Sequence, residues 1–146
     1  MPDILRSMWD DINAACFAGE LTPPADISWQ ETGGENGIGA HGVYLPKPNA
    51  IAIDERFRPD IAAVKAKDPK EIGKLEIVYR LVIHEMIHQA LHQRNAPTPG
   101  GHGASFCSEA ERVAKLLAAS GIEVVTPTLD NAKYWPFGTD RTETGL

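Results

Sequence analysis

The segment from Leu75 to Leu91 constrains the fold of this chain more than any other feature of the sequence. On a helical wheel its apolar residues gather on one side (Leu75, Tyr79, Val82, Met86 and Ala90) and again on another (Ile77, Leu81 and Leu91). A helix that is apolar nearly all round is a buried one. The sequence therefore predicts a long helix in the interior of the protein.

Two histidines and a glutamate interrupt this apolar surface, in the order His84-Glu85-Met86-Ile87-His88. A helix turns once in about 3.6 residues, so both imidazoles lie on one face, and Glu85 lies about 100° round from His84. The same pattern can arise by chance on an exposed helix. On a buried helix, however, leaving these three polar side chains without partners would cost on the order of several kcal/mol of folding free energy. A zinc ion would bind both imidazoles, and Glu85 would take a proton from a zinc-activated water.

A catalytic zinc ion requires a third protein ligand and an open position for water. His92 lies one turn further along the helix, but three ligands along two turns would span about 12 Å, too far to converge on one ion. Glu109 or Glu111 could supply a carboxylate ligand from a second helix. His102 is favoured, because the Pro- and Gly-rich segment before it can reverse the chain and return a ligand to the first helix.

The first histidine segment and a second one, Gly101-His102-Gly103-Ala104-Ser105-Phe106-Cys107, together resemble the SprT-like (Spartan-type) zinc metalloprotease family, whose motif is HExxH followed by a loop and HGxxF. The resemblance covers the chain from about Ile4 to Leu117 and includes upstream matches at Asn13, Phe17, Gly19-Glu20-Leu21 and Ile27-Ser28-Trp29. It implies one zinc ion per chain, held by His84, His88 and His102. It also implies Glu85 as the catalytic residue and a protein or peptide as substrate.

The remaining elements predict an α+β fold. Asp3 is the expected cap of a first helix, which Gly19 ends. Strands are expected at residues 25–31, 40–45 and 49–54, with Pro46-Lys47-Pro48 joining the last two in a hairpin. A closing helix is expected from about Ala104 to Ser120, followed by a short strand at 122–126 and an aromatic cluster at 134–137 that packs over the core.

This order fits a zincin-like metalloprotease domain, in which a small antiparallel sheet packs on a long HExxH helix with N-terminal and C-terminal helices. We expect one domain over residues 1–138, with a glycine-rich mobile turn at 32–39 and a disordered tail at 139–146. In zincins an extended peptide pairs with the edge strand above the metal, so the hairpin at residues 41–53 is the expected substrate-binding edge.

Several side chains could assist the reaction. His41 and Tyr44 lie on the expected edge and could stabilise the tetrahedral intermediate, although a histidine beside a turn glycine is more often merely exposed. Glu109 or Glu111 could accept a hydrogen bond from a ligand histidine and orient its ring. Sequence alone names no donor for the oxyanion.

Composition limits the partners. The net charge is −6, which opposes binding to nucleic acid. Lys65, Lys67, Lys70 and Lys74 cluster before the apolar helix, but such runs are more often solvated faces. The two cysteines form no CxxC pair, so neither a second zinc site nor a disulfide framework is expected.

The chain shows no signal peptide and no apolar run long enough to span a bilayer, so we expect a cytoplasmic protein without a membrane partner. Three function classes stay open at this point. They are an active zinc metallopeptidase, a DNA-associated protease that acts on DNA-bound or DNA-crosslinked proteins, and a non-catalytic zinc-binding adaptor.

Overall fold

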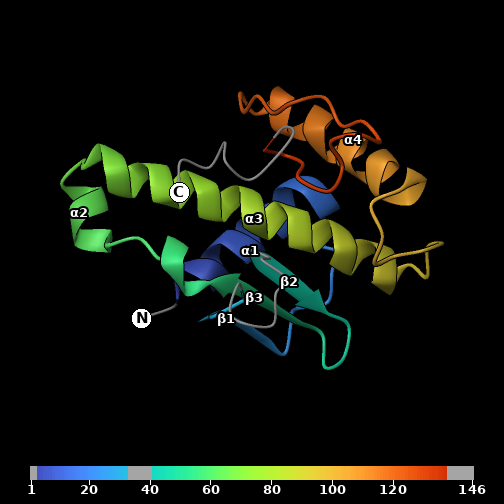
Figure 1. Cartoon of the computed structure of the whole chain (residues 1–146), viewed down its shortest axis with the longest axis horizontal. Coiled ribbons are helices and arrows are strands. Elements are labelled where there is room, and N and C mark those ends of the chain that lie inside the picture. Colours follow the sequence, from blue (N-terminus) through green and yellow to red (C-terminus); the bar gives the residue numbers. More distant parts are fainter. Residues whose placement is uncertain (1–2, 33–40, 138–146) are drawn as a thin grey trace. The chain divides into compact units, whose positions relative to one another are not determined.

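The computed structural model describes residues 3–32 and 41–137 (Figure 1). Their elements follow the order α1 (Ile4–Phe17), β1 (Asp26–Gln30), β2 (Gly42–Leu45), β3 (Ala50–Asp54), the 3-10 helix η1 (Glu55–Phe57), α2 (Ile61–Lys65), α3 (Pro69–Gln93) and α4 (Ala104–Ala119). The fold is α+β, as the sequence predicts. The chain divides into two compact units, one of residues 1–8 and 24–85 and the other of residues 9–23 and 86–146.

The first unit contains a three-stranded sheet with the order β1-β3-β2. β2 pairs with β3 antiparallel, which confirms the hairpin, whereas β1 pairs with β3 in parallel, with Ile27 opposite Ile51. The prediction of an antiparallel sheet is therefore wrong, since the sheet is mixed. Alternation of apolar residues indicates a strand but not the direction of its neighbour, so it could not reveal the parallel pairing. The five residues of β3 are all buried, as suits its central position in the sheet.

The two short helices between β3 and α3, η1 and α2, were not predicted from the sequence. Each begins at an aspartate cap: Asp54 accepts a hydrogen bond from the amide of Arg56, and Asp60 accepts one from the amide of Ala63. The amide of Asp60 donates in turn to the buried carboxylate of Glu71, at 2.8 Å. Helices this short are specified by their caps rather than by hydrophobic periodicity, so the pattern that reveals α3 misses them.

Both ends of α1 lie where the sequence predicts. The carboxylate of Asp3 accepts a hydrogen bond from the amide of Leu5 at 3.0 Å, as an N-terminal cap does. The helix ends at Phe17, and Gly19 follows with a φ of +72°, a left-handed conformation that glycine adopts without steric cost.

The predicted apolar helix is α3, which is buried in its second half, whereas Leu75, Ile77 and Tyr79 in its first half are partly exposed. In the first unit its buried apolar residues are Val78, Leu81, Val82 and Ile83, and in the second they are Met86, Ile87, Ala90 and Leu91. Gln89 is also buried; it accepts a hydrogen bond from Trp9 Nε1 at 2.9 Å and donates one to the carbonyl of Thr22 at 2.8 Å. One polar side chain thus ties two other segments of the second unit to α3.

The closing helix α4 buries the predicted stripe of Phe106, Ala110, Val113 and Leu117, together with Glu109. The strand predicted at residues 122–126 is wrong, because these residues have no regular secondary structure and pair with no strand among those described. Turns follow, in which Trp135 is fully buried and donates from Nε1 to the carbonyl of Val125 at 2.7 Å. The expected turn at 32–39 and tail at 139–146 lie outside the described residues, apart from Thr32.

No helix among the described residues combines the length and the apolar character needed to cross a bilayer.

Candidate metal centre

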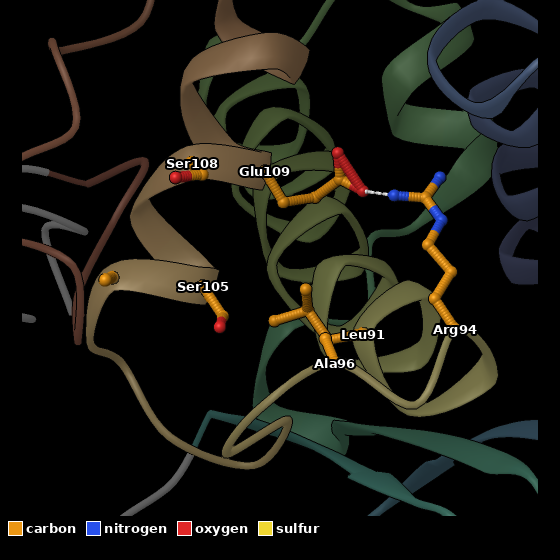
Figure 2. A pocket seen from close by; sticks show the side chains of 7 residues that line it. Leu91, Arg94, Ala96, Ser105, Ser108 and Glu109 are labelled. Atoms are coloured by element: carbon orange, nitrogen blue, oxygen red, sulfur yellow. Dashed lines mark hydrogen bonds and ion pairs between the residues drawn. The ribbon is translucent and has the colours of Figure 1, made fainter.

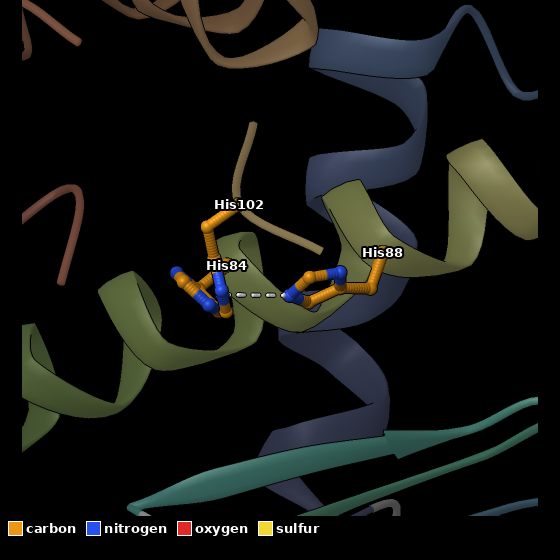
Figure 3. Close-up of side chains that lie close together, drawn as sticks. All are labelled: His84, His88 and His102. Atoms are coloured by element: carbon orange, nitrogen blue, oxygen red, sulfur yellow. Dashed lines mark hydrogen bonds between the residues drawn. The ribbon is translucent and has the colours of Figure 1, made fainter. Parts of the chain in front are cut away.

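Three histidine side chains point toward one another in the structure (Figure 3). His84 and His88 lie one turn apart on α3, and His102 lies in the loop before α4. One ring nitrogen from each lies within 4.8 Å of the other two, a spacing that could hold a metal ion. The structure therefore brings together the three histidines that the sequence singles out.

His88 and His102 face each other through their Nε2 atoms, which lie 3.1 Å apart. The other ring nitrogen of His88, Nδ1, lies 3.0 Å from the carbonyl oxygen of Pro99. A carbonyl oxygen only accepts hydrogen bonds, so Nδ1 carries the proton and the Nε2 lone pair points toward His102. Nitrogen ligands about 2.1 Å from a tetrahedral zinc ion lie about 3.4 Å apart, so this pair of rings fits a zinc ion with little adjustment.

Burial keeps these imidazoles in the neutral form that binds metals. It lowers the pKa of His102 to about 4, with further lowering from His88 and Lys133. It also lowers the pKa of His88, an effect that the hydrogen bond to Pro99 opposes and His92 reinforces. At neutral pH both rings are therefore neutral, with one nitrogen lone pair each that a proton does not occupy and a metal ion can bind.

Phe106, in the first turn of α4, forms a wall behind two of these rings. Its ring centroid lies 5.0 Å from that of His88 and 5.1 Å from that of His102, and its side chain is fully buried. Hydrophobic periodicity predicts the burial of Phe106, but it gives no sign that the ring packs against two metal-ligand candidates.

Glu85 follows His84 on α3 and is 6 % exposed. Within the first unit, the backbone of β2 passes close to its carboxylate: a Cβ atom on Gly42 would lie 3.4 Å from Glu85 Oε2 and 3.1 Å from Ile53 Cδ1. The glycine at the start of β2 therefore leaves space in front of the Glu85 carboxylate. In the sequence, the one signal for this role is a glycine at the start of a predicted strand, and it was not among the candidate site residues.

The predictions for Glu109 and Glu111 need correction. Both carboxylate oxygens of Glu109 bind guanidinium groups, one from Arg94 and one from Arg112, so Glu109 is not a member of the histidine group and its hydrogen bonds go to arginines instead of a ligand ring. Glu111 points to solvent and pairs with Lys115 at 3.8 Å. The partner of His88 Nδ1 is a backbone carbonyl instead, and the side-chain sequence carries no signal for that contact.

The remaining candidates lie outside the histidine group. His92 is not a member of it, as the helical geometry predicts. His41 packs against Phe57 with ring centroids 4.8 Å apart, and the hydroxyl of Tyr44 donates to Asn49 Oδ1 at 2.7 Å within the hairpin. Burial raises the pKa of Tyr44. These contacts give both residues structural roles in the first unit.

The second unit also contains a pocket of about 430 Å³ at the junction of α3 and α4 (Figure 2). Its lining comprises Leu91, Arg94, Ala96, Ala104, Ser105, Ser108 and Glu109. None of the three clustered histidines lines it, so the pocket and the metal centre are separate features.

Comparison of the chain with family models, with curated proteins and with solved structures found no match. Function therefore has to be argued from the geometry and chemistry of the site itself.

Proposed function

We propose that this protein is a zinc-dependent metallopeptidase of the SprT-like type with a zincin-like domain. The observation that carries the proposal is the convergence of His84, His88 and His102 next to the buried carboxylate of Glu85. Three protein ligands are the set typical of catalytic zinc sites, in which the fourth position is left to water or substrate.

The donor set favours zinc among the common metal ions. Three neutral imidazoles suit zinc, copper, iron and nickel, whereas magnesium and calcium prefer oxygen ligands. Zinc is the usual ion for an HExxH helix with a third ligand from another segment. When bound here, zinc would act as a Lewis acid toward a water molecule and toward the substrate carbonyl.

Glu85 is the proposed general base and acid. It follows His84 on the helix, about 100° round the axis, so it is close to the metal site without being a ligand, and it is buried. The carboxylate accepts a proton from the attacking water and then donates that proton to the leaving amine. Peptide hydrolysis requires both transfers, and one side chain can perform them in sequence.

The edge of the sheet is the proposed docking strand for a peptide substrate. In the part of the chain that the structure describes, β2 pairs with β3 on one side and with no strand on the other. An extended peptide can hydrogen-bond to such an edge. The closeness of Gly42 to Glu85 Oε2 supports this proposal, because it links the edge strand to the catalytic carboxylate.

Replacing Glu85 by Gln tests the proposal. The substitution keeps the size of the side chain and removes the base, so we expect peptidase activity to fall by about a hundredfold to ten-thousandfold while one zinc ion per chain is retained. Activity on an unfolded protein substrate and zinc content, measured on the same samples, give both readouts. Glu76→Gln, an exposed position on the same helix, is the matched control and should leave both unchanged.

The outcome also separates the other function classes. Peptidase activity that survives Glu85→Gln would contradict the proposal. A wild-type protein that binds zinc and cleaves nothing would favour the adaptor class. Activity that requires DNA and falls steeply with salt would favour the DNA-associated class.

A further inference from the structure

A buried carboxylate with two arginine partners lies at the base of the loop that carries His102. The side chain of Glu109 is 4 % exposed, and Arg94 Nη1 donates to its Oε2, as Figure 2 shows. Arg112 Nε donates to the other oxygen at 2.5 Å. Hydrogen bonds between charged groups are about twice as strong as neutral ones, so this cluster fixes its members in place.

The Arg94–Glu109 pair closes the loop between the two helices. Arg94 is the first residue after α3, and Glu109 lies in the second turn of α4, with His102 between them in the chain. Inside the loop, a few backbone contacts such as Ala96 N to the carbonyl of Leu91 at 2.9 Å provide the local order. The ion pair joins the two ends of the loop, and the ring of His88 also holds the loop through the carbonyl oxygen of Pro99.

Glu109 lies on the buried face of α4, three residues after Phe106. Residues three apart share a helix face, so holding Glu109 also directs Phe106, whose ring packs against His88 and His102. On the far side of Glu109, the guanidinium of Arg112 lies 5.3 Å from the ring centroid of buried Phe17. The carboxylate thus connects α4 to α1 as well as to the end of α3, all within the second unit.

We propose that Arg94 and Glu109 are positioning residues that hold His102 and Phe106 in the arrangement a metal ion requires. The inference rests on the proposed metal centre and extends it to a carboxylate that does not bind the ion. A loop ordered in advance loses less conformational entropy when the ion binds, so the affinity for metal increases. The sequence offered Glu109 only as an alternative to His102 or as a partner of a ligand ring, whereas in the structure its carboxylate binds two arginines.

Zinc affinity, measured by competition with a chromophoric chelator, tests the proposal. We expect the Kd for zinc to rise about tenfold or more in Glu109→Gln and in Arg94→Gln, as it does when supporting residues of other metal sites are removed. The double variant should bind no more weakly than the weaker single variant, because both changes break one interaction. Arg94→Lys retains the charge and should recover part of the affinity.

Glu111→Gln is the matched control, since Glu111 lies on the same helix but is exposed. A pair with only a structural role would lower the melting temperature of the metal-free protein without changing zinc affinity. If Glu109→Gln does not fold, Arg94→Gln decides, because the Arg94 side chain is 42 % exposed and tolerates replacement.

The possible results distinguish this proposal from the proposed function. Wild-type zinc binding with an unchanged Kd in folded Arg94→Gln would overturn the positioning role alone. Zinc binding that weakens in the variants of a protein without peptidase activity would support the positioning role and overturn the proposed function. A wild-type protein that binds no zinc would overturn both.

Discussion

At the scale of single residues, the contacts that set the chemistry of the site are made by groups that a sequence motif does not include. The carbonyl of Pro99 fixes the tautomer of His88, and the absence of a side chain at Gly42 leaves room beside Glu85. The motif predicts which residues converge. It cannot predict which backbone atoms support them, because any residue type supplies a carbonyl.

Gly42 should tolerate a small side chain better than a branched one. The Cβ of Gly42→Ala would meet Glu85 Oε2 at an ordinary 3.4 Å and would displace only the flexible end of Ile53, so we expect activity within about threefold of wild type. The added methyl groups of Gly42→Val would crowd the carboxylate and should lower kcat/KM by about tenfold to a hundredfold with unchanged zinc content. Steady-state peptidase kinetics provide the measurement.

Gly73 offers a control for the Gly42 variants. It lies within α3, and a Cβ there meets no atom within 4 Å. Gly73→Ala should leave activity unchanged and stabilise the protein by up to about 1 kcal/mol, because alanine favours a helix. Equal activity in Gly42→Val and Gly73→Ala would show that the space beside Glu85 has no catalytic role.

The lowered pKa of His102 predicts how the metal-free protein responds to acid. The folded-state pKa of about 4 lies below the ordinary value of 6.5, so the unfolded chain binds more protons between these two values. The neutral ring therefore contributes fully to stability above pH 6.5, and that contribution is lost as the pH falls toward 4. His102→Gln removes the effect, so the melting temperature of the variant relative to wild type should rise between pH 6.5 and 4. A difference that stays constant over this range would contradict the shift.

At the scale of elements, the sequence predicts what local signals determine. The cap at Asp3, the antiparallel hairpin and the apolar stripe of α4 are specified by neighbouring residues, and the structure confirms them. The order of the strands depends on which strand becomes most buried after the chain has folded. The direction of β1 depends on how the chain returns between β1 and β3. Both are tertiary properties that alternation within a single strand does not encode, so the parallel pairing of β1 could not be predicted.

Gln89 is the polar residue of α3 whose replacement should cost most stability in the second unit. Gln89→Met removes its hydrogen bonds with Trp9 and Thr22 in a buried setting, where we expect a loss of about 2 to 4 kcal/mol in the free energy of unfolding. Gln93 also makes two hydrogen bonds, with Thr22 and Glu20, but at an exposed position. Gln93→Met should therefore cost less than about 1 kcal/mol, and urea denaturation of the two variants compares them directly. Equal losses of unfolding free energy in Gln89→Met and Gln93→Met would show that burial does not determine how much these hydrogen bonds stabilise the protein.

At the scale of the whole molecule, the acidic character of the chain bears on its partners. Lys74 pairs with Glu71 at 3.4 Å, so one lysine of the cluster predicted to be a solvated face already has a carboxylate partner. With a net charge of −6, a nucleic-acid partner would have to bind against an overall repulsive field. A peptide that pairs with the β2 edge through backbone hydrogen bonds does not depend on a positively charged protein surface.

The three-histidine site is the claim on which the proposed function and the positioning role both depend. X-ray absorption at the zinc edge tests it most directly on protein loaded with one zinc ion per chain. The predicted shell contains three imidazole nitrogens at about 2.0 to 2.1 Å and one further light atom. A sulfur ligand at about 2.3 Å, or a shell with fewer than three imidazoles, would contradict the site described here.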